Sequence, residues 1–379
     1  MIFLTYKIIK RGLVLKYFDT YTSNTLAAAA NQHFFINEDT DKEYTSRVFY
    51  KVFAGGRYNY SFLFSNIIDS TFSNGAVSHM NLICDEWEIV SASVAIADEC
   101  NMSTMPEMGE FAALTFGEKK AKTVAPGEFF SSDPIELSPE KGQYLCLEMT
   151  FKGRMIPYHE ESIIPIFALE DGEWKYCRKM PLACMVGCDR PVKKRVGFIG
   201  DSITQGIGTP KNSYEHYASV VADLLGEENS YWDIGIGYGR GNDAATDSAW
   251  LFKAKQLDVI TVCFGVNDIN QGFTAEQIIK NLDTILDKLH AAGVKVIMQT
   301  VPPFNYSSAR IDTWNRVNDH IMTSMAERTE GIFDVRDVLS LSAEEPYMAK
   351  FGGHPDSVGN GIWGRELYKT VKAVIEEQE

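Results

Sequence analysis

One stretch decides the fold of this chain: Val196-Gly197-Phe198-Ile199-Gly200-Asp201-Ser202-Ile203-Thr204-Gln205-Gly206. An apolar segment of strand length ends at Gly200, and an acidic and a hydroxyl residue follow before the next glycine. In an open α/β sheet, ligands bind beyond the carboxyl ends of the strands. A serine at such a place has its hydroxyl in a cleft, beside free backbone N–H groups. Asp and Ser are also common helix caps, so this stretch alone leaves a structural and a chemical interpretation open.

Further apolar segments of strand length follow at 231–236, 259–264, 294–300 and 332–335, with helical segments between them. The clearest helix begins with Thr274 and Gln277 at the spacing of a capping box. It then places an apolar stripe on one face: Ile278, Leu282, Ile285, Leu286 and Leu289. Strands that alternate with helices imply right-handed crossovers and a parallel sheet. We therefore predict a flavodoxin-like, doubly wound, five-stranded α/β domain at residues 191–379.

The first half of the chain has a period of two instead. Alternating runs occur at 58–64, 90–96 and 145–151, and glycine-containing turns such as Gly55-Gly56 and Asp171-Gly172 separate the runs. Short alternating strands with frequent turns are typical of an antiparallel β-sandwich, which we predict at residues 41–190. Its aromatic faces could form a carbohydrate platform or simply a core. Residues 1–40 show no clear period and form either an extension or an added edge strand.

The composition of the chain limits the kinds of partner and substrate that we expect. The 379 residues contain 36 basic and 51 acidic side chains, a formal net charge of −15, and 45% of the residues are hydrophobic. An acidic surface repels polyphosphates and anionic lipid, so we expect neither nucleic acid nor a membrane as a partner. A small molecule or an oligosaccharide remains compatible as a substrate. The oligomeric state is left open.

Cysteines and the N-terminus bear on where the protein is located. Seven cysteines are an odd number in a long chain, so we expect free thiols rather than a disulfide framework. Cys184 and Cys188 have no second Cys or His pair nearby, and we expect no metal and no cofactor. Residues 1–18 lack an uninterrupted apolar region with a cleavage site, and no later run suits a membrane span. A cytoplasmic location is the default expectation.

Polar residues follow four of the predicted strands. Ser202 follows the first strand, and the glycine-rich segment 235–241 follows the second. Asn267 follows the third strand, and His354 comes after the fifth. A serine is a poor nucleophile without an adjacent base, and histidine is the side chain best suited to accept its proton. Attack on an acyl carbon also needs N–H donors for the negative oxygen that develops. The Ser202 backbone, a glycine N–H and the Asn267 side chain could supply them.

This arrangement resembles the GDSL or SGNH hydrolases, which carry serine, glycine, asparagine and histidine in four blocks. Gly200-Asp201-Ser202-Ile203 matches the first block, Gly265-x-Asn267-Asp268 the third, and His354-Pro355 the last. The resemblance implies Ser202 as nucleophile, His354 as general acid and base, and Asn267 as an oxyanion donor. For the second block, Tyr238-Gly239-Arg240-Gly241 looks like the loop of two-domain carbohydrate acetylesterases of this superfamily. That favours Gly239 as the backbone donor, with Gly237 as the alternative.

One departure concerns the acid that usually precedes the histidine. The family carries Asp three, occasionally two, residues before it, where this chain has Phe351 and Gly352. Such an acid normally holds the imidazole in the tautomer that accepts from serine. A backbone carbonyl, Asp356 or another distant carboxylate could replace it, or activity could be lost. Some two-domain acetylesterases of the superfamily are understood to work with a Ser–His dyad. The remaining histidines, including His216, are expected to be structural or surface residues.

The first half also resembles the jelly-roll domain that precedes some GDSL hydrolases. Gly55-Gly56-Arg57 leads to Phe64-Ser65-Asn66, and Ala125-Pro126-Gly127 leads to Ser132-Asp133-Pro134. Together the resemblances imply a serine esterase that removes small acyl groups, in particular acetyl, from carbohydrate. Two alternatives remain: a lipase or lysophospholipase acting on long acyl chains, and a non-catalytic glycan-binding relative.

Overall fold

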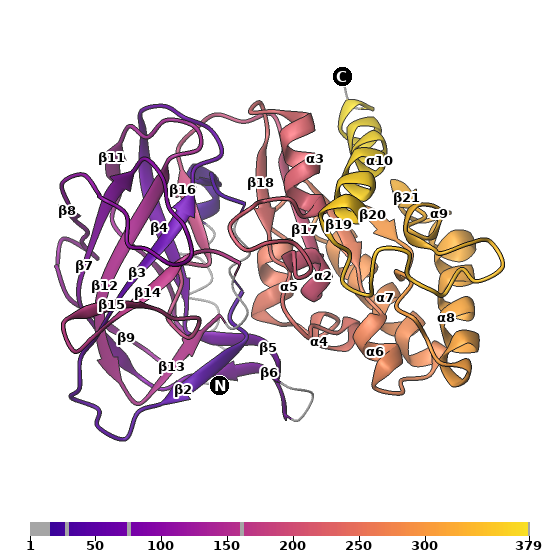
Figure 1. The fold of residues 1–379 in the computed structure, drawn as a ribbon, viewed down its shortest axis with the longest axis horizontal. Coiled ribbons are helices and arrows are strands. Elements are labelled where there is room, and N and C mark those ends of the chain that lie inside the picture. The colour runs from indigo at the N-terminus through magenta and orange to yellow at the C-terminus, as the bar shows by residue number, and fades with distance from the viewer. Residues whose placement is uncertain (1–15, 27–29, 74–76, 160–162, 378–379) are drawn as a thin grey trace. The chain divides into compact units, whose positions relative to one another are not determined.

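A computed structural model describes residues 16–26, 30–73, 77–159 and 163–377. Five strands in its second half form one parallel sheet (Figure 1). In chain order they are β17 (Arg195–Gly200), β18 (Ser230–Asp233), β19 (Val259–Cys263), β20 (Lys295–Gln299) and β21 (Gly331–Phe333). They lie side by side as β18-β17-β19-β20-β21, and every neighbouring pair is parallel. The first strand thus lies between the second and the third, the flavodoxin-like order of a doubly wound sheet. The predicted parallel sheet is confirmed.

Helices connect these strands and also follow the last one. They are α2 (Ser202–Gln205), α3 (Tyr217–Leu225), α4 (Gly241–Ala244), α5 (Ala249–Ala254), α6 (Val266–Asn270), α7 (Ala275–His290), α8 (Ser308–His320), α9 (Arg336–Leu339) and α10 (Ser357–Glu376). A π-helical turn, Ile321–Met325, continues α8. The capping box of α7 is present, since Thr274 and Gln277 each bond the backbone N–H of the other. The apolar stripe expected on α7 is buried, so local sequence and packing agree there.

The first half of the chain is rich in antiparallel sheet. A five-stranded sheet contains β1-β16-β4-β10 with β11 beside β4, and a seven-stranded sheet contains β15-β14-β3-β12-β7-β8 with β9 beside β7. The strands are β1 (Thr22–Ser23), β3 (Tyr44–Lys51), β4 (Tyr58–Ser65), β7 (Trp87–Ala97), β8 (Ala112–Ala113), β9 (Lys122–Val124), β10 (Phe129–Ser131), β11 (Ile135–Leu137), β12 (Tyr144–Gly153), β14 (Ile166–Glu170), β15 (Glu173–Tyr176) and β16 (Met185–Cys188). A smaller sheet pairs β2 (His33–Ile36) with β13 (Met155–Tyr158).

The segment expected at 1–40 is partly an edge strand. Among the described strands, β1 pairs with β16 and lies at the border of the five-stranded sheet. This agrees with the edge-strand alternative for residues 22–23. Residues 1–15 and 27–29 of that segment lie outside the described residues.

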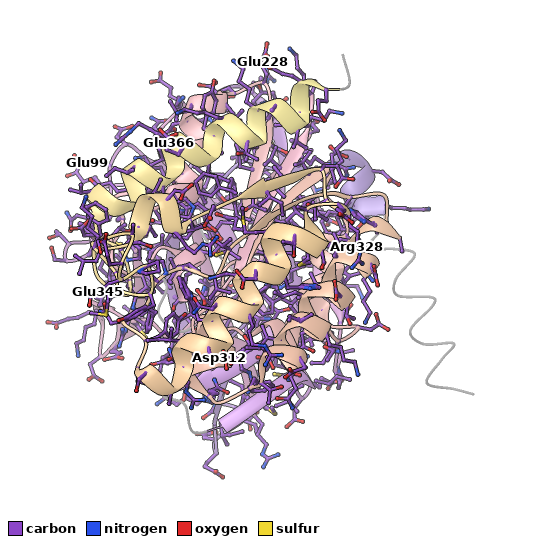
Figure 2. All side chains as sticks on the ribbon, turned by 90° about the vertical axis from the view of Figure 1, so that its right-hand side faces the viewer. Glu99, Glu228, Asp312, Arg328, Glu345 and Glu366 are labelled. Atoms are coloured by element: carbon purple, nitrogen blue, oxygen red, sulfur yellow. The ribbon has the colours of Figure 1, made fainter. Side chains whose placement is uncertain are left out.

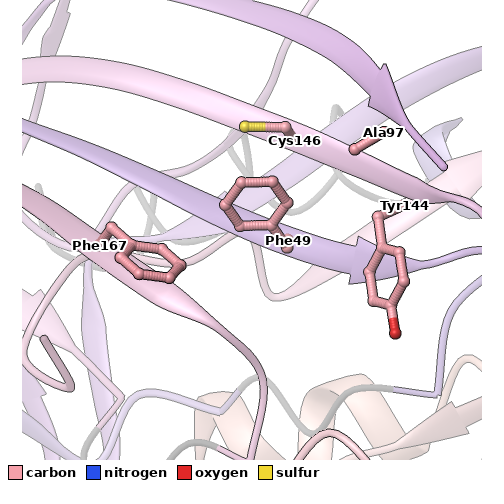
Figure 3. Close-up of a cluster of buried hydrophobic side chains, with 5 residues drawn as sticks. All are labelled: Phe49, Ala97, Tyr144, Cys146 and Phe167. Carbon is pink, nitrogen blue, oxygen red and sulfur yellow. The ribbon is translucent and has the colours of Figure 1, made fainter. Parts of the chain in front are cut away.

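Aromatic side chains of the alternating strands form core. Tyr60, Phe62 and Phe64 of β4 are all buried. A carbohydrate platform needs exposed ring faces, so that alternative is wrong for these three rings. Figure 3 shows a second cluster, to which β3, β7, β12 and β14 contribute Phe49, Ala97, Tyr144, Cys146 and Phe167. All seven cysteines of the chain carry free thiols, as expected, and five of them are buried.

The chain divides into two compact units, although not only at the junction near residue 191. The first contains described residues of Met1–Ile68 and Asn81–Val192, and the second those of Asp69–Met80 and Lys193–Glu379. The second unit therefore includes most of the hairpin of β5 (Ile67–Ser73) and β6 (Val77–Ile83), which the sequence interpretation gave to the sandwich. Asp69 in β5 and Lys253 in α5 are fully buried, with Oδ2 and Nζ 2.6 Å apart. A buried charge needs such a partner, which explains why this segment packs with the second unit.

The surface carries many of the acidic side chains. Figure 2 labels Asp312, Glu345 and Glu366, and the first two are exposed.

Of the helices in the described part of the chain, not one is long and apolar enough to cross a bilayer.

Candidate active site

Ser202 lies where the sequence predicted, at the carboxyl end of β17 and in the first turn of α2. Asp201 caps this short helix, because its Oδ1 accepts from the Ile203 N–H at 2.9 Å. Gly200 lets the turn close, since a Cβ there would lie 2.1 Å from Oγ1 of Thr204 and 2.5 Å from the Cys263 carbonyl. The N–H groups of a first helical turn have no carbonyl partner within the helix. The Ser202 backbone N–H is therefore a donor placed beside its own hydroxyl.

His354 meets Ser202 directly. It lies in the loop between α9 and α10, 152 positions further along the chain, and its Nε2 is 2.8 Å from Oγ of Ser202. This distance is that of a hydrogen bond between a hydroxyl and an imidazole nitrogen. A base within such reach of a serine hydroxyl is the arrangement that activates a nucleophile. The two side chains predicted to react with each other are thus brought together.

Asn267 and Asp268, which open α6, hold the glycine-rich loop that follows β18. Nδ2 of Asn267 donates to the Gly239 carbonyl at 3.0 Å. The carboxylate of Asp268 accepts from the N–H groups of Gly241 and Asn242, at 3.0 and 3.2 Å. The loops after the second and third strands are therefore tied together by three hydrogen bonds.

The backbone N–H of Gly239, which the sequence suggested as an oxyanion donor, already makes a hydrogen bond in this structure. Its N–H closes a turn onto the Ile236 carbonyl at 3.0 Å, and its own carbonyl accepts from Asn267. A Cβ at this position would lie 2.6 Å from the ring of Trp250, so only glycine fits the observed packing. In this structure Gly239 enters the site as the acceptor that orients Asn267. The other sequence candidate, Gly237, precedes Tyr238, whose φ of 59° turns the loop.

Burial shifts the titration of the groups around the site. It raises the pKa of Asp201 to about 7 and that of Asp268 to about 6. It lowers the pKa of His354 below its usual 6.5. Each shift has the sign that removal from water gives to the charged form. A lowered pKa keeps His354 neutral, the form that accepts a proton, at neutral and mildly acidic pH.

The acid that was missing from the sequence is not replaced by Asp356. This residue caps α10, and its Oδ1 accepts from the Gly359 N–H at 2.9 Å. Phe351 packs on α10, since a Cβ at Gly359 would lie 2.7 Å from the Cβ of Phe351. Among the residues that the structure describes, no carboxylate contributes to the pKa shift of His354. The distant-carboxylate alternative therefore has no support from Asp356.

Three other histidines, which lie in the described part of the second unit, occupy structural positions. His216 and Asp233 are fully buried, with Nε2 and Oδ2 3.3 Å apart. His290 and His320 end α7 and α8 and face Glu330 and Asp283. Across the described ranges, groups of three or more His, Cys, Asp or Glu side chains that could hold a metal ion do not occur.

One contact of the site was missed by the sequence interpretation. The ring of Phe304, in the loop after β20, lies 5.5 Å from the imidazole of His354, centroid to centroid. Its position in the sequence could have indicated this contact. Phe304 follows the carboxyl end of the fourth strand, as Ser202 follows that of the first strand and Asn267 that of the third.

Comparison with known proteins finds a family model that matches part of the second half of the chain. Residues 198–362 match the model of the GDSL-like Lipase/Acylhydrolase family. A protein of Mycoplasma pneumoniae described as uncharacterized is 29% identical over 136 residues, which are 33% of this chain. The matched part is 15% of that protein's length.

Solved structures similar to this chain include three hydrolase-like proteins. The aryl esterase of M. smegmatis is 15% identical and covers 48% of this chain and 99% of its own, with a TM-score of 0.38. Est24, a carbohydrate acetylesterase from Sinorhizobium meliloti, is 16% identical with the same coverage and the same TM-score. A member of the lipolytic protein G-D-S-L family from Veillonella parvula is 16% identical and covers 47% and 98%, with a TM-score of 0.37.

The family match begins within β17 and includes both tied loops and the histidine loop. Residues 198–362, which contain Ser202, Asn267 and His354, form a GDSL-like lipase/acylhydrolase domain.

Proposed function

We propose that this chain is a serine esterase that hydrolyses small acyl esters, in particular acetyl esters, of carbohydrate hydroxyls. The observation that carries the proposal is the 2.8 Å contact between Oγ of Ser202 and Nε2 of His354. The family match supports ester hydrolysis in general. The narrower choice of acetylated carbohydrate rests on the resemblance of the loop Tyr238-Gly239-Arg240-Gly241 to that of carbohydrate acetylesterases.

In the proposed reaction, Ser202 attacks the ester carbonyl while neutral His354 takes the hydroxyl proton at Nε2. The tetrahedral intermediate collapses when the imidazolium gives this proton to the leaving sugar alcohol, and an acyl-enzyme remains on Ser202. A water molecule then attacks the acyl group with His354 again as the base, and the acid and free serine are released. This is the two-step course by which a serine–histidine pair divides one difficult displacement.

The negative oxygen of each intermediate needs donors. We assign two of them to the Ser202 N–H and to Asn267, whose Nδ2 keeps a second proton when the first is donated to Gly239. The third assigned donor is the Gly239 N–H. To bind the negative oxygen, it must either donate to this oxygen and the Ile236 carbonyl at once or give up its hydrogen bond to that carbonyl. Preorganised donors of this kind supply a large part of the rate enhancement in acyl transfer.

For the first unit we propose a jelly-roll domain. The two antiparallel sheets and the turn motifs at 55–57 and 125–127 support it. An experimental structure that traced connections other than those of a jelly roll between the two sheets would replace this assignment.

The test of the proposed function is hydrolysis of p-nitrophenyl acetate and release of acetate from acetylated oligosaccharides. Ser202→Ala should abolish both activities, because no nucleophile remains, and should also abolish labelling by a fluorophosphonate. A series of esters from acetate to octanoate separates the esterase from a lipase. Rates that fall with chain length support the proposal, and rates that rise favour a lipase. A Ser202→Ala variant with full activity, or a wild-type serine inert to the label, would exclude this nucleophile.

A further inference from the structure

The imidazole of His354 is held without the acid that usually orients it. Phe351 faces α10, Gly352 has no side chain, and Asp356 is engaged in the cap of α10. A catalytic histidine nevertheless needs a fixed ring plane, because a misplacement of about 1 Å can cost a factor of 10² in rate. The contacts that the ring and its backbone do make identify what fixes it.

Phe304 is the aromatic side chain in contact with this imidazole. The two ring centroids are 5.5 Å apart and the ring planes are at 80°, an edge-to-face geometry. Aromatic pairs favour this arrangement because a positive ring edge meets a negative ring face. The contact therefore restricts rotation of the imidazole about its side-chain bonds.

Phe304 also packs on the backbone just before the histidine. A Cβ at Gly353 would lie 2.9 Å from the ring of Phe304, so a larger residue would push the ring away. Glycine at this position lets the phenyl ring lie directly on the chain that carries His354. Gly208 also approaches this segment closely, since a Cβ there would lie 2.4 Å from the Pro355 carbonyl.

The loop that carries Phe304 is itself fastened to the histidine segment. The Asn305 N–H donates to the Tyr347 carbonyl at 3.1 Å, and the Ala349 N–H donates to Oδ1 of Asn305 at 2.9 Å. The Val301 N–H donates to Oδ1 of Asn318 on α8 at 2.7 Å. Because both loops are tied to each other, the ring of Phe304 has a defined position relative to His354.

We propose that Phe304 is the positioning residue of His354 and fixes the imidazole by packing, in the place that a carboxylate takes in a three-residue arrangement. The inference rests on the proposed function of Ser202 and His354. Phe304 acts through His354 and takes no part in proton transfer.

The charged and titratable groups near His354 do not provide the orientation. Asp201 lies beside Ser202 on α2, Tyr306 lies in the loop of Phe304, and Lys350 and Asp356 lie in the histidine segment. Of the described residues none is a cause of the lowered pKa, which burial alone produces. Loss of the phenyl ring would hydrate the imidazole and raise its pKa toward 6.5.

The experiment compares Phe304→Ala, Phe304→Leu and Phe304→Tyr with the wild-type chain, using p-nitrophenyl acetate from pH 4.5 to 8. Phe304→Ala should lower kcat about 10- to 100-fold, leave KM nearly unchanged, and move the acid limb of the pH profile to higher pH. Phe304→Tyr keeps the ring and should restore kcat. Phe304→Leu keeps most of the volume without an aromatic edge, and should fold as the wild type and show an intermediate loss.

Phe351→Leu is the matched control, since it alters an aromatic residue of the same segment that faces α10. It should lower thermal stability without moving the acid limb. Two outcomes would overturn the inference: a wild-type kcat and acid limb in Phe304→Leu and Phe304→Ala, or the same shift in Phe351→Leu. Ser202→Ala separates these outcomes from failure of the proposed function, since retained activity in that variant would exclude the nucleophile itself.

Discussion

The serine end and the histidine end of the site are built by different means. Each reactive residue has an aspartate nearby that caps a helix: Asp201 caps α2 and Asp356 caps α10. Asp201 is buried and its pKa is raised to about 7, whereas Asp356 is exposed. The serine is thus held by backbone hydrogen bonds and a buried cap, while the histidine is held by packing against Phe304 and two glycines. The carboxylate of Asp356, although close in sequence to His354, therefore does not hold its ring.

Replacement of His354 tests the histidine end of the site. After replacement of Ser202, it should cause the largest loss of kcat. His354→Ala should lower kcat about 10²- to 10⁴-fold, the range for loss of general acid–base catalysis. Initial rates with p-nitrophenyl acetate measure it. His320→Ala, which alters a histidine at the end of α8, is the control and should keep wild-type rates. Equal losses in the two variants would show that His354 acts only through stability.

Asn267 tests the donors on the serine side. Asn267→Ala should lower kcat about 10²- to 10³-fold, close to 3 kcal/mol of transition-state stabilisation, with a smaller change in KM. Asn270→Ala changes an exposed amide of the same short helix and should have little effect. A loss confined to KM would place Asn267 in substrate binding and remove it from the oxyanion site.

The buried carboxyl of Asp201 makes stability depend on pH. Its pKa is about 3.8 in the unfolded chain and about 7 in the folded chain. The folded state therefore holds a proton that the unfolded state releases, and stability is lost as pH rises from about 4 to about 7. Asp201→Asn keeps an oxygen for the Ile203 N–H and removes this titration, so Tm should fall less between pH 5 and pH 8. Asp223→Asn, at an exposed position of α3, should retain the wild-type slope. An unchanged slope in Asp201→Asn would assign the dependence to other groups.

Replacement of Asp356 should have the smallest effect of these changes. It should lower stability without lowering kcat. Asp356→Ala removes the cap of α10 and should cost about 1 kcal/mol of unfolding free energy. Asp356→Asn, which keeps an acceptor for the Gly359 N–H, should recover most of it. Denaturant unfolding measures both, and kcat with its acid limb should stay at wild-type values. A 100-fold loss of kcat in Asp356→Asn, together with a shifted acid limb, would instead make this carboxylate the partner of His354.

Much of the fold was determined by the sequence itself, because its signals are local. The period of two in the first half, the apolar stripe on α7 and its Thr274–Gln277 cap depend on residues a few positions apart. The places of Ser202, Asn267 and His354 were also predictable, because motifs that follow parallel strands gather at one edge of a sheet.

Other features were decided only by the tertiary structure, because they depend on contacts between distant segments. The hydrogen bond from Asn267 to the Gly239 carbonyl and the contact between Phe304 and His354 follow from how separate loops pack together. The grouping of residues 69–80 with the second unit likewise depends on a buried partner, Lys253, that lies 184 positions from Asp69. Sequence periodicity does not reveal contacts between distant segments, because the packing energy of these contacts depends on the shape and burial of side chains in the folded chain.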